Sequence, residues 1–294
     1  MSRTVSAPVF DKKKQVLLIP DLVPIHRELL ANVIRASGYR VEVLRTHGAD
    51  VMEAGLKYIH NDMCYPAICS LGQQLHAITS GTHDPADVAF VQFQTGGGCR
   101  ASNYSMVLRK ALNKLGLEIP IVTLGFSTLS RNSGFSLTPA MCIRALVAVT
   151  YGDLLLLLGN QVRPYETNPG QTQSLLRRWE ETLGRELSAA RAGLGQVKRN
   201  LKNIARSFAE IPVKAAKKVK VGIVGEVYVK YSPFANNQLE EFLQNQDCEY
   251  MLPGVLGFLR YCLSSPAVDW ELYGGSRFSR EVSVFLGRVI GRFE

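Results

Sequence analysis

Two cysteines, Cys64 and Cys99, stand where the chain could use their thiols for chemistry. Each precedes a segment that reads as the first turn of a helix: Pro66 suits an early helical position, and Ser102 or Asn103 can cap the segment after Cys99. The partial positive charge of a helix N-terminus favours the thiolate, the form that attacks electrophiles and binds metal ions. The two cysteines are therefore candidates for a reactive or metal-binding site, with two buried packing thiols as the alternative.

Short apolar runs alternate with helical patterns over the first half of the chain. The pattern predicts strands at 15–20, 40–44, 88–94 and 119–124, helices at 24–37, 67–79 and 104–115, and a weak helix or a turn at 49–59. This alternation is typical of a parallel sheet with helices on both faces, which binds ligands beyond the carboxyl ends of its strands. Cys99 follows a strand directly, and Cys64 is expected to do so, which would bring both thiols to the same edge of the sheet.

The second half of the chain is expected to hold fewer strands. The pattern predicts helices at 137–162, 171–209, 233–244, 254–263 and 285–293, and strands at 219–224 and 249–252. We therefore expect an α/β protein with two Rossmann-like or flavodoxin-like parallel-sheet domains joined by a helical connector. The predicted domains are an N-terminal α/β domain at 1–165, a basic connector at 166–217 and an incomplete second α/β domain at 218–294.

The composition is that of a soluble globular protein, with 46% hydrophobic and 20% charged residues in a chain of 294. The first fourteen residues lack the apolar region of a signal peptide, and the apolar helix at 137–162 carries Arg144 and Asp153, which favours a buried helix over a membrane span. We expect a cytoplasmic location and no membrane partner. Six cysteines without a CxxC pair make a disulfide scaffold or a structural zinc site improbable.

The net charge of +9 raises the question of a nucleic-acid partner. Many of the basic residues lie in the predicted connector, where Glu180, Glu181 and Glu186 alternate with them. Neither aromatic stacking residues nor a nucleic-acid-binding motif accompanies them, so a solvated helical pair is the favoured interpretation. We expect no nucleic-acid partner.

Three glycines, Gly96, Gly97 and Gly98, precede Cys99 and form a candidate cofactor-binding loop. A phosphate cradle is one interpretation, although the loop lacks the Lys-Ser/Thr of a P-loop and does not match GxGxxG. The other is that glycines allow the backbone to approach a bulky cofactor held by Cys99. Both interpretations place a ligand at this loop.

Other polar positions are open to two interpretations. The segment 225–237 is polar and aromatic and follows a strand, so it is either a structural loop or a loop on the substrate side. His26 could face the same cleft, although a lone histidine is more often structural. The remaining cysteines lie in apolar or strand-like contexts and are expected to pack in the core; they are Cys69, Cys142, Cys248 and Cys262.

Three motifs carry a resemblance to a known family. They are His60-Asn61-Asp62-Met63-Cys64-Tyr65-Pro66, then Gln94-Thr95-Gly96-Gly97-Gly98-Cys99-Arg100, and then Gly225-Glu226-Val227-Tyr228-Val229-Lys230 with Pro233-Phe234-Ala235-Asn236-Asn237. In this order they resemble the 2-hydroxyacyl-CoA dehydratase and benzoyl-CoA reductase superfamily. The branch that the chain resembles most is that of the acyl-CoA dehydratase activase-related proteins, which include the double-cubane cluster proteins. The resemblance spans nearly the whole chain.

This resemblance implies an oxygen-sensitive iron–sulfur protein with a [4Fe-4S] or [8Fe-9S] cluster. It implies an ATP-hydrolysing activase as electron donor, an acyl-CoA or small molecule as substrate of a reductase or (R)-2-hydroxyacyl-CoA dehydratase reaction, and a homodimer or heterodimer. The family has three cluster cysteines per chain, and two of them correspond to Cys64 and Cys99. No catalytic residue follows from it.

The third cluster cysteine of the family lies in a Pro-Phe-x-Cys-type motif near the C-terminus, which has no counterpart here. Neither Cys248 nor Cys262 has a context that would replace it, so we expect a chain shortened at its C-terminus. A cluster-free binding or assembly protein with the same fold is the alternative function. A third possibility, an enzyme with Cys99 as nucleophile, lacks an adjacent histidine base in the sequence.

Overall fold

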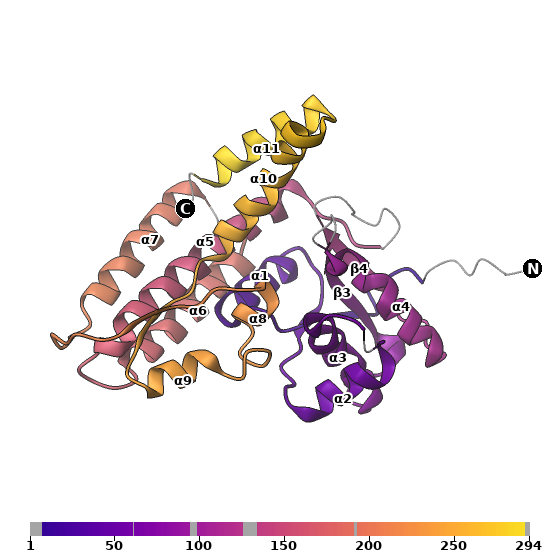
Figure 1. Cartoon of the computed structure of the whole chain (residues 1–294), viewed down its shortest axis with the longest axis horizontal. Coiled ribbons are helices and arrows are strands. Elements are labelled where there is room, and N and C mark those ends of the chain that lie inside the picture. The colour runs from indigo at the N-terminus through magenta and orange to yellow at the C-terminus, as the bar shows by residue number, and fades with distance from the viewer. Residues whose placement is uncertain (1–7, 61, 95–98, 126–133, 191–192, 292–294) are drawn as a thin grey trace, which may run out of the picture.

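The computed structural model describes residues 8–60, 62–94, 99–125, 134–190 and 193–291 (Figure 1). Its N-terminal half holds a parallel sheet in the order β2-β1-β3-β4, made of β1 (Val16–Ile19), β2 (Val41–Val43), β3 (Val88–Gln94) and β4 (Ile121–Gly125). Leu17 lies opposite both Val41 and Ala89, and Phe90 lies opposite Ile121. The expected mixed α/β class with a parallel sheet is confirmed, and every strand overlaps its predicted range.

Helices cover both faces of this sheet because successive strand residues point to opposite sides. Leu18 and Phe90 pack against one group of helices, α2 (Ala49–Tyr58), α3 (Tyr65–Thr79) and α4 (Tyr104–Lys114). Leu17 and Ala89 pack on the other side, against α1 (Pro24–Arg35) and the start of α5 (Pro139–Val162). The chain after each strand is thereby directed to the same edge of the sheet, as the sequence predicts.

Two glycines allow α2 and α3 to pack backbone against backbone. A methyl group on Gly72 would collide with the carbonyl oxygen of Val51, and one on Gly55 would collide with that of Ile68. Any larger residue at either position would force the helices apart, so glycine is required here. This contact fixes α3, the helix that begins directly after Cys64.

A layer of helices lies against α1. It contains α5, α6 (Gln171–Ser188) and α7 (Leu194–Ala209), whose apolar residues form one core cluster with Leu29 and Val33. The expected helical pair over 171–209 is present, and its basic side chains are exposed on the solvent face, among them Arg177, Arg178, Lys198, Arg199 and Lys202. The described residues also form the short 3₁₀ turns η1 (Pro85–Asp87), η2 (Arg100–Asn103) and η3 (Arg163–Tyr165).

The helical stretch Pro139–Tyr165, which contains α5, is long and apolar enough to cross a membrane. Half of its most apolar window is buried inside the protein, where Tyr151 and Leu155 contact α1, α6 and α7 residues. Burial of this kind is common in the core helices of globular proteins.

The C-terminal part holds a second, two-stranded parallel sheet formed by β5 (Lys220–Gly222) and β6 (Glu249–Met251). Around it lie α8 (Val227–Tyr231), α9 (Leu239–Asn245), α10 (Val255–Tyr273) and α11 (Arg277–Ile290). Tyr231 and Tyr250 form its core together with Leu156 of α5, so this part is joined to the helical layer.

Three predicted helix boundaries in this part are wrong. The helix expected at 233–244 begins only at Leu239, because Asn237 and Gln238 adopt left-handed backbone angles. The helix expected to end at Leu263 continues through Pro266 to Tyr273. The last helix begins at Arg277, where the Ser276 side chain accepts a hydrogen bond from the Ser279 amide.

Candidate functional site

Two glutamines attach α3 to the strands of the first sheet. Gln73 accepts a hydrogen bond from the Asp21 amide at 3.0 Å and donates to the Thr46 carbonyl at 2.9 Å, so it ties together the segments that follow β1 and β2. Gln74 donates to the Val91 carbonyl of β3 at 2.9 Å. Both glutamines are almost fully buried. The middle of α3 is thus held against the strands and the segments that follow β1 and β2.

Cys64 occupies the N-cap position of α3, with Pro66 in the first turn as expected. It is partly buried, and its sulfur lies 3.0 Å from the hydroxyl oxygen of Tyr104 on α4. The expected placement of this thiol at a helix N-terminus is therefore confirmed. The expected strand before it is wrong: among the described residues Cys64 follows α2, through a short loop. Its hydrogen-bond partner is a residue to which the sequence analysis gave no role.

Cys99 is exposed and forms the N-cap of η2, the turn that leads into α4. Its sulfur accepts a hydrogen bond from the Ala101 amide at 3.5 Å. The neighbouring Arg100 donates to the backbone oxygen of Asp62, so the Cys99 turn is tied to the loop that carries Cys64. The candidate cofactor residues Gly96, Gly97 and Gly98 lie outside the described residues.

Tyr104 is hydrogen-bonded to Cys64 and begins the helix that follows the Cys99 turn. Burial raises its pKa most, and the hydrogen bond with Cys64 and the negative charges of Cys64, Glu226 and Cys99 raise it further. The phenol therefore stays protonated at neutral pH, and it can donate its hydrogen to the Cys64 sulfur. A protonated phenol beside the Cys64 sulfur is a donor that can stabilise a thiolate at that position.

The third sequence motif also reaches this site. Glu226 accepts a hydrogen bond from the Val229 amide at 2.9 Å and so caps α8, and it lies close enough to Tyr104 to raise the pKa of the phenol. Burial lowers the pKa of Lys230, while the charge of Glu226 opposes that change. The pKa of Tyr104 thus responds to the charge at the start of α8 as well as to the two cysteines.

Residues that follow Glu226 pack against α3. Tyr228 and Ala235 are buried against Cys69 of α3, and the Phe234 ring lies 5.6 Å from that of His47. The segment 225–237 is thus packed in part as structure, with an Asn236 side chain that accepts a hydrogen bond from the Leu239 amide. Its charge at Glu226 acts on Tyr104, and its later residues pack against Cys69 of α3.

The remaining cysteines differ from this pair. Cys69 is buried, as predicted, and burial raises its pKa to about 11, although a hydrogen bond with Tyr65 opposes the rise. Cys248 and Cys262 are partly buried. Cys142 is exposed, so its predicted packing role is wrong: it lies on the outward face of α5, next to the exposed Ile143.

The described residues contain no group of three or more His, Cys, Asp or Glu side chains arranged to hold a metal ion. Cys64 and Cys99 together would supply two thiolate ligands, and a complete site would need others. The donor set fits a thiolate-bound metal at those two positions, since thiolates suit iron–sulfur clusters and the neighbouring phenol supplies an outer hydrogen bond.

His26 is structural. Its Nε2 lies 2.7 Å from Asp153 Oδ1 of α5, and its exposure is only 1%. Both carboxylate oxygens of Asp153 also accept hydrogen bonds from the first amides of α10, at Val255 (2.7 Å) and Leu256 (2.8 Å). Asp153 thereby joins α1, α5 and α10, a role that the sequence did not indicate.

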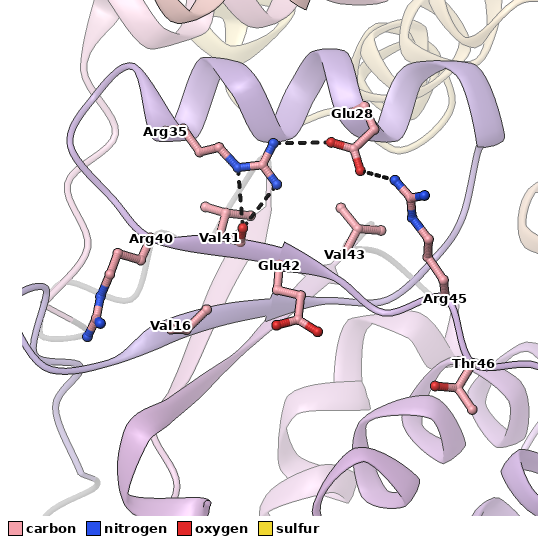
Figure 2. Close-up of a pocket in the computed structure, with 9 residues that line it drawn as sticks. All are labelled: Val16, Glu28, Arg35, Arg40, Val41, Glu42, Val43, Arg45 and Thr46. Atoms are coloured by element: carbon pink, nitrogen blue, oxygen red, sulfur yellow. Dashed lines mark hydrogen bonds and ion pairs between the residues drawn. The ribbon is translucent and has the colours of Figure 1, made fainter. Parts of the chain in front are cut away.

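A surface groove of about 700 Å³ lies beside the edge strand β2 (Figure 2). Arg35 donates from Nε and Nη2 to the Val41 carbonyl at 3.3 and 3.0 Å, and from Nη1 to Glu28 at 3.1 Å. Arg45 pairs with the second oxygen of Glu28. The groove's charged groups are thus largely paired with each other, and none of the site cysteines lines it.

Comparison of the chain with models of protein families, with curated proteins and with solved structures gave no match.

Proposed function

We propose that the chain is an iron–sulfur protein in which Cys64 and Cys99 provide two of the thiolate ligands of a [4Fe-4S] or [8Fe-9S] cluster. The observation that carries this proposal is that the turns bearing the two cysteines are joined: Arg100, next to Cys99, donates to the backbone oxygen of Asp62, and the Cys64 sulfur lies 3.0 Å from the hydroxyl oxygen of Tyr104 on the helix after the Cys99 turn. The proposal needs further ligands from outside this pair, supplied by another subunit or by residues beyond those described.

The proposed cluster would supply low-potential electrons to an acyl-CoA or small-molecule substrate, in a reductase or 2-hydroxyacyl-CoA dehydratase-like system fed by an ATP-hydrolysing activase. The chain's own residues would hold the cluster at the open edge of the sheet. Tyr104 would donate a hydrogen bond to the Cys64 sulfur, and Arg100 would keep the two loops together. Gly96, Gly97 and Gly98 would let the backbone approach the cluster.

The finer architecture belongs to the same proposal. We infer that the first sheet and the β5–β6 sheet are the centres of two Rossmann-like domains, with α6 and α7 as the connector. The β5–β6 pair, with the helices around it, repeats the strand–helix–strand order of the first sheet, which supports this division.

The test is the iron and acid-labile sulfide content of anaerobically purified protein, with visible and electron paramagnetic resonance spectra. Cys64→Ser and Cys99→Ser should each remove the bound iron. Cys142→Ser, an exposed thiol away from the site, is the matched control and should leave the content unchanged. Unchanged iron in both site variants would contradict the assignment.

Tyr104→Phe sharpens the test because it removes only the hydroxyl beside Cys64. We expect iron to be retained but the reduction potential to shift to lower values, since a hydrogen bond to a cluster thiolate stabilises the more negative, reduced state. If the protein binds no iron or sulfide under any condition, the cluster-free binding or assembly function takes the place of this proposal.

A further inference from the structure

The outer side of α7 carries only basic charge. The helix contains no acidic residue, and four basic side chains on it are exposed: Lys198, Arg199, Lys202 and Arg206. At 3.6 residues per turn these four positions fall on one side of the helix. The opposite side holds Val197, Ile204 and Phe208, which are buried in the core cluster shared with α5 and α6. We call the exposed side, with its four basic residues, the basic face.

The acidic residues that alternate with basic residues in the sequence belong to another helix. Glu180, Glu181 and Glu186 all lie on α6, where they neighbour the arginines of that helix. Glu186 accepts hydrogen bonds from Gln196 at 3.3 Å and from Asn200 at 2.6 Å, so its charge is held between the two helices. The surface of α6 is therefore mixed in charge, whereas that of α7 is uniformly positive. This separation removes the argument from alternating charges against a nucleic-acid partner.

The basic run continues after α7. Residues 194–220 contain eight lysines and arginines but one acidic residue, Glu210, which lies just past the last turn of the helix. Lys218 and Lys220 form ion pairs with acidic side chains of the C-terminal part. The other six make no ion pair within the described part of the chain, and all of them are exposed. Most of the chain's net charge of +9 thus lies here.

The spacing of the basic face works against the helix itself. Lys198 and Lys202 are four residues apart, and so are Lys202 and Arg206, which makes the side chains of each pair neighbours on the helix surface. Like charges at this spacing destabilise a helix, and α7 has no acidic residue to offset them. A bound polyanion would remove this repulsion, so the face is suited to a row of negative charges.

The other residues of the basic face are small. Gly195, Ala205 and Ala209 are exposed between the basic side chains, and the only large apolar side chain exposed on α7 is Leu194, at its first residue. Interfaces between proteins have an apolar core, and a membrane-surface helix inserts its apolar face into the bilayer, whereas α7 uses that face for its own core. Protein–DNA interfaces are more polar and much more positively charged. A nucleic acid therefore fits this face best.

The basic face offers no platform for unpaired bases. Phe208, the one aromatic residue of α7, is only 2% exposed, and single strands are held by stacking their bases on aromatic side chains. Contacts with phosphates need charge alone and carry no sequence information. Helix α7 lies at the outer edge of the molecule (Figure 1), where it can approach the major groove, which admits a helix in DNA but is narrow in double-stranded RNA.

We propose that the basic face of α7 binds the phosphates of double-stranded DNA without sequence preference. The contacting side chains are Lys198, Arg199, Lys202 and Arg206. This binding function is separate from the cysteine site and goes beyond the proposed function.

Fluorescence anisotropy with a short fluorescein-labelled DNA duplex tests the proposal, measured over a series of salt concentrations. For four phosphate contacts we expect the logarithm of the association constant to fall with the logarithm of the salt concentration with a slope of about −3.6. The dissociation constant should be on the order of 10 µM at about 0.05 M salt, and equal for duplexes rich in A·T and in G·C.

A single substitution on each helix separates the basic face from general surface charge. Lys202→Gln should weaken binding on the order of tenfold at that salt concentration and reduce the magnitude of the slope by about one. Arg178→Gln, at an exposed basic residue of α6 three residues before Glu181, is the matched control and should change neither quantity. Because Lys202→Gln removes two like-charge pairs, it should not lower the midpoint of urea unfolding, so lost binding is not lost folding.

The opposite results are equally specific. Absence of duplex binding at about 0.05 M salt, or equal weakening by Lys202→Gln and Arg178→Gln, would overturn the proposal. Tighter binding of the single strand would also contradict it. Binding of polyglutamate or of phosphatidylserine vesicles in place of DNA would assign the face to an acidic protein or to lipid. DNA binding should persist in Cys64→Ser, which separates this result from the outcome of the iron measurement.

Discussion

The α2–α3 pair and the C-terminal hairpin, formed by α10 and α11, both place glycines between two helices, yet they treat their large apolar side chains in opposite ways. In α2–α3 the glycines permit direct backbone contact, and residues such as Leu71 and Leu75 are buried in the sheet core. In α10–α11 the glycines line a groove together with Tyr261 and Leu263, and large residues such as Tyr273, Phe278 and Phe285 are exposed. The first pair buries its large apolar side chains, whereas the second leaves much of its apolar surface exposed.

The two helix pairs also differ in where their hydrogen bonds to the rest of the protein lie. Around α3, the buried amides of Gln73 and Gln74 are hydrogen-bonded to the strands. The hairpin is fastened mainly at its base, where Asp153 accepts the first amides of α10. This difference implies that the hairpin can be loosened without disturbing the site around Cys64.

The largest effect is expected from Asp153→Ala. It leaves His26 Nε2 and the amides of Val255 and Leu256 without their acceptor, and an unsatisfied buried donor costs about 1–3 kcal/mol. We expect a loss of roughly 3 kcal/mol in the free energy of unfolding, measured with urea. Hydrogen exchange should rise first in α10. Equal acceleration in α3 would contradict the division between the two regions.

Alanine substitutions at Gly72 and Gly287 compare the packing of α2–α3 with that of α10–α11. Gly72→Ala should destabilise the protein by about 1–3 kcal/mol, because the new methyl group collides with the Val51 carbonyl. Gly287→Ala has open space around it and should stabilise α11 by about 0.5–1 kcal/mol. Urea denaturation of both variants measures the contrast. A similar loss at both positions would show that the hairpin is as tightly packed as α2–α3.

The smallest effect concerns how the stability of the protein depends on acidic pH through Glu28 of α1, which pairs with Arg35 and Arg45. Burial raises the pKa of Glu28, but hydrogen bonds from Arg45 and Arg35 outweigh it and leave the pKa below its ordinary value of 4.5. Its contribution is therefore complete above pH 4.5 and is lost as the pH falls through the lower folded value.

Because Glu28 and its arginine partners are partly exposed, we expect their pairing to contribute less than about 1 kcal/mol to the free energy of unfolding. Glu28→Gln should give a flatter dependence of the unfolding free energy on pH in that acidic range than the wild-type chain. A steeper dependence in the variant would contradict the assignment.

The first sheet could be predicted from the sequence because each of its strands is a short apolar run between clear helix signals. The position of Cys99 followed from the same pattern, since parallel strands end at a common edge, whereas Cys64 follows α2 and not the strand predicted before it. The helix boundaries after Pro233 could not be predicted, because left-handed residues at Asn237 and Gln238 shift the start of α9.

Three residues of functional interest were missed. Tyr104 shares a helix face with Leu108 and Leu112, so its burial was predictable, and a buried phenol needs a hydrogen-bond partner. That its partner is Cys64 depends on how α3 and α4 lie on the sheet. Glu226 and Asp153 act across contacts between distant segments, for which the local sequence carries no signal.

Arg35 also affects the edge strand β2 of the first sheet. Strand β2 lies at an end of the sheet, where free backbone groups can recruit a strand from another molecule. The guanidinium of Arg35 already occupies the outward carbonyl of Val41, and Glu28 holds it there (Figure 2). An incoming strand would have to displace this side chain before it could pair. The same arginine that joins α1 to β2 thus protects the protein against fibrous aggregation.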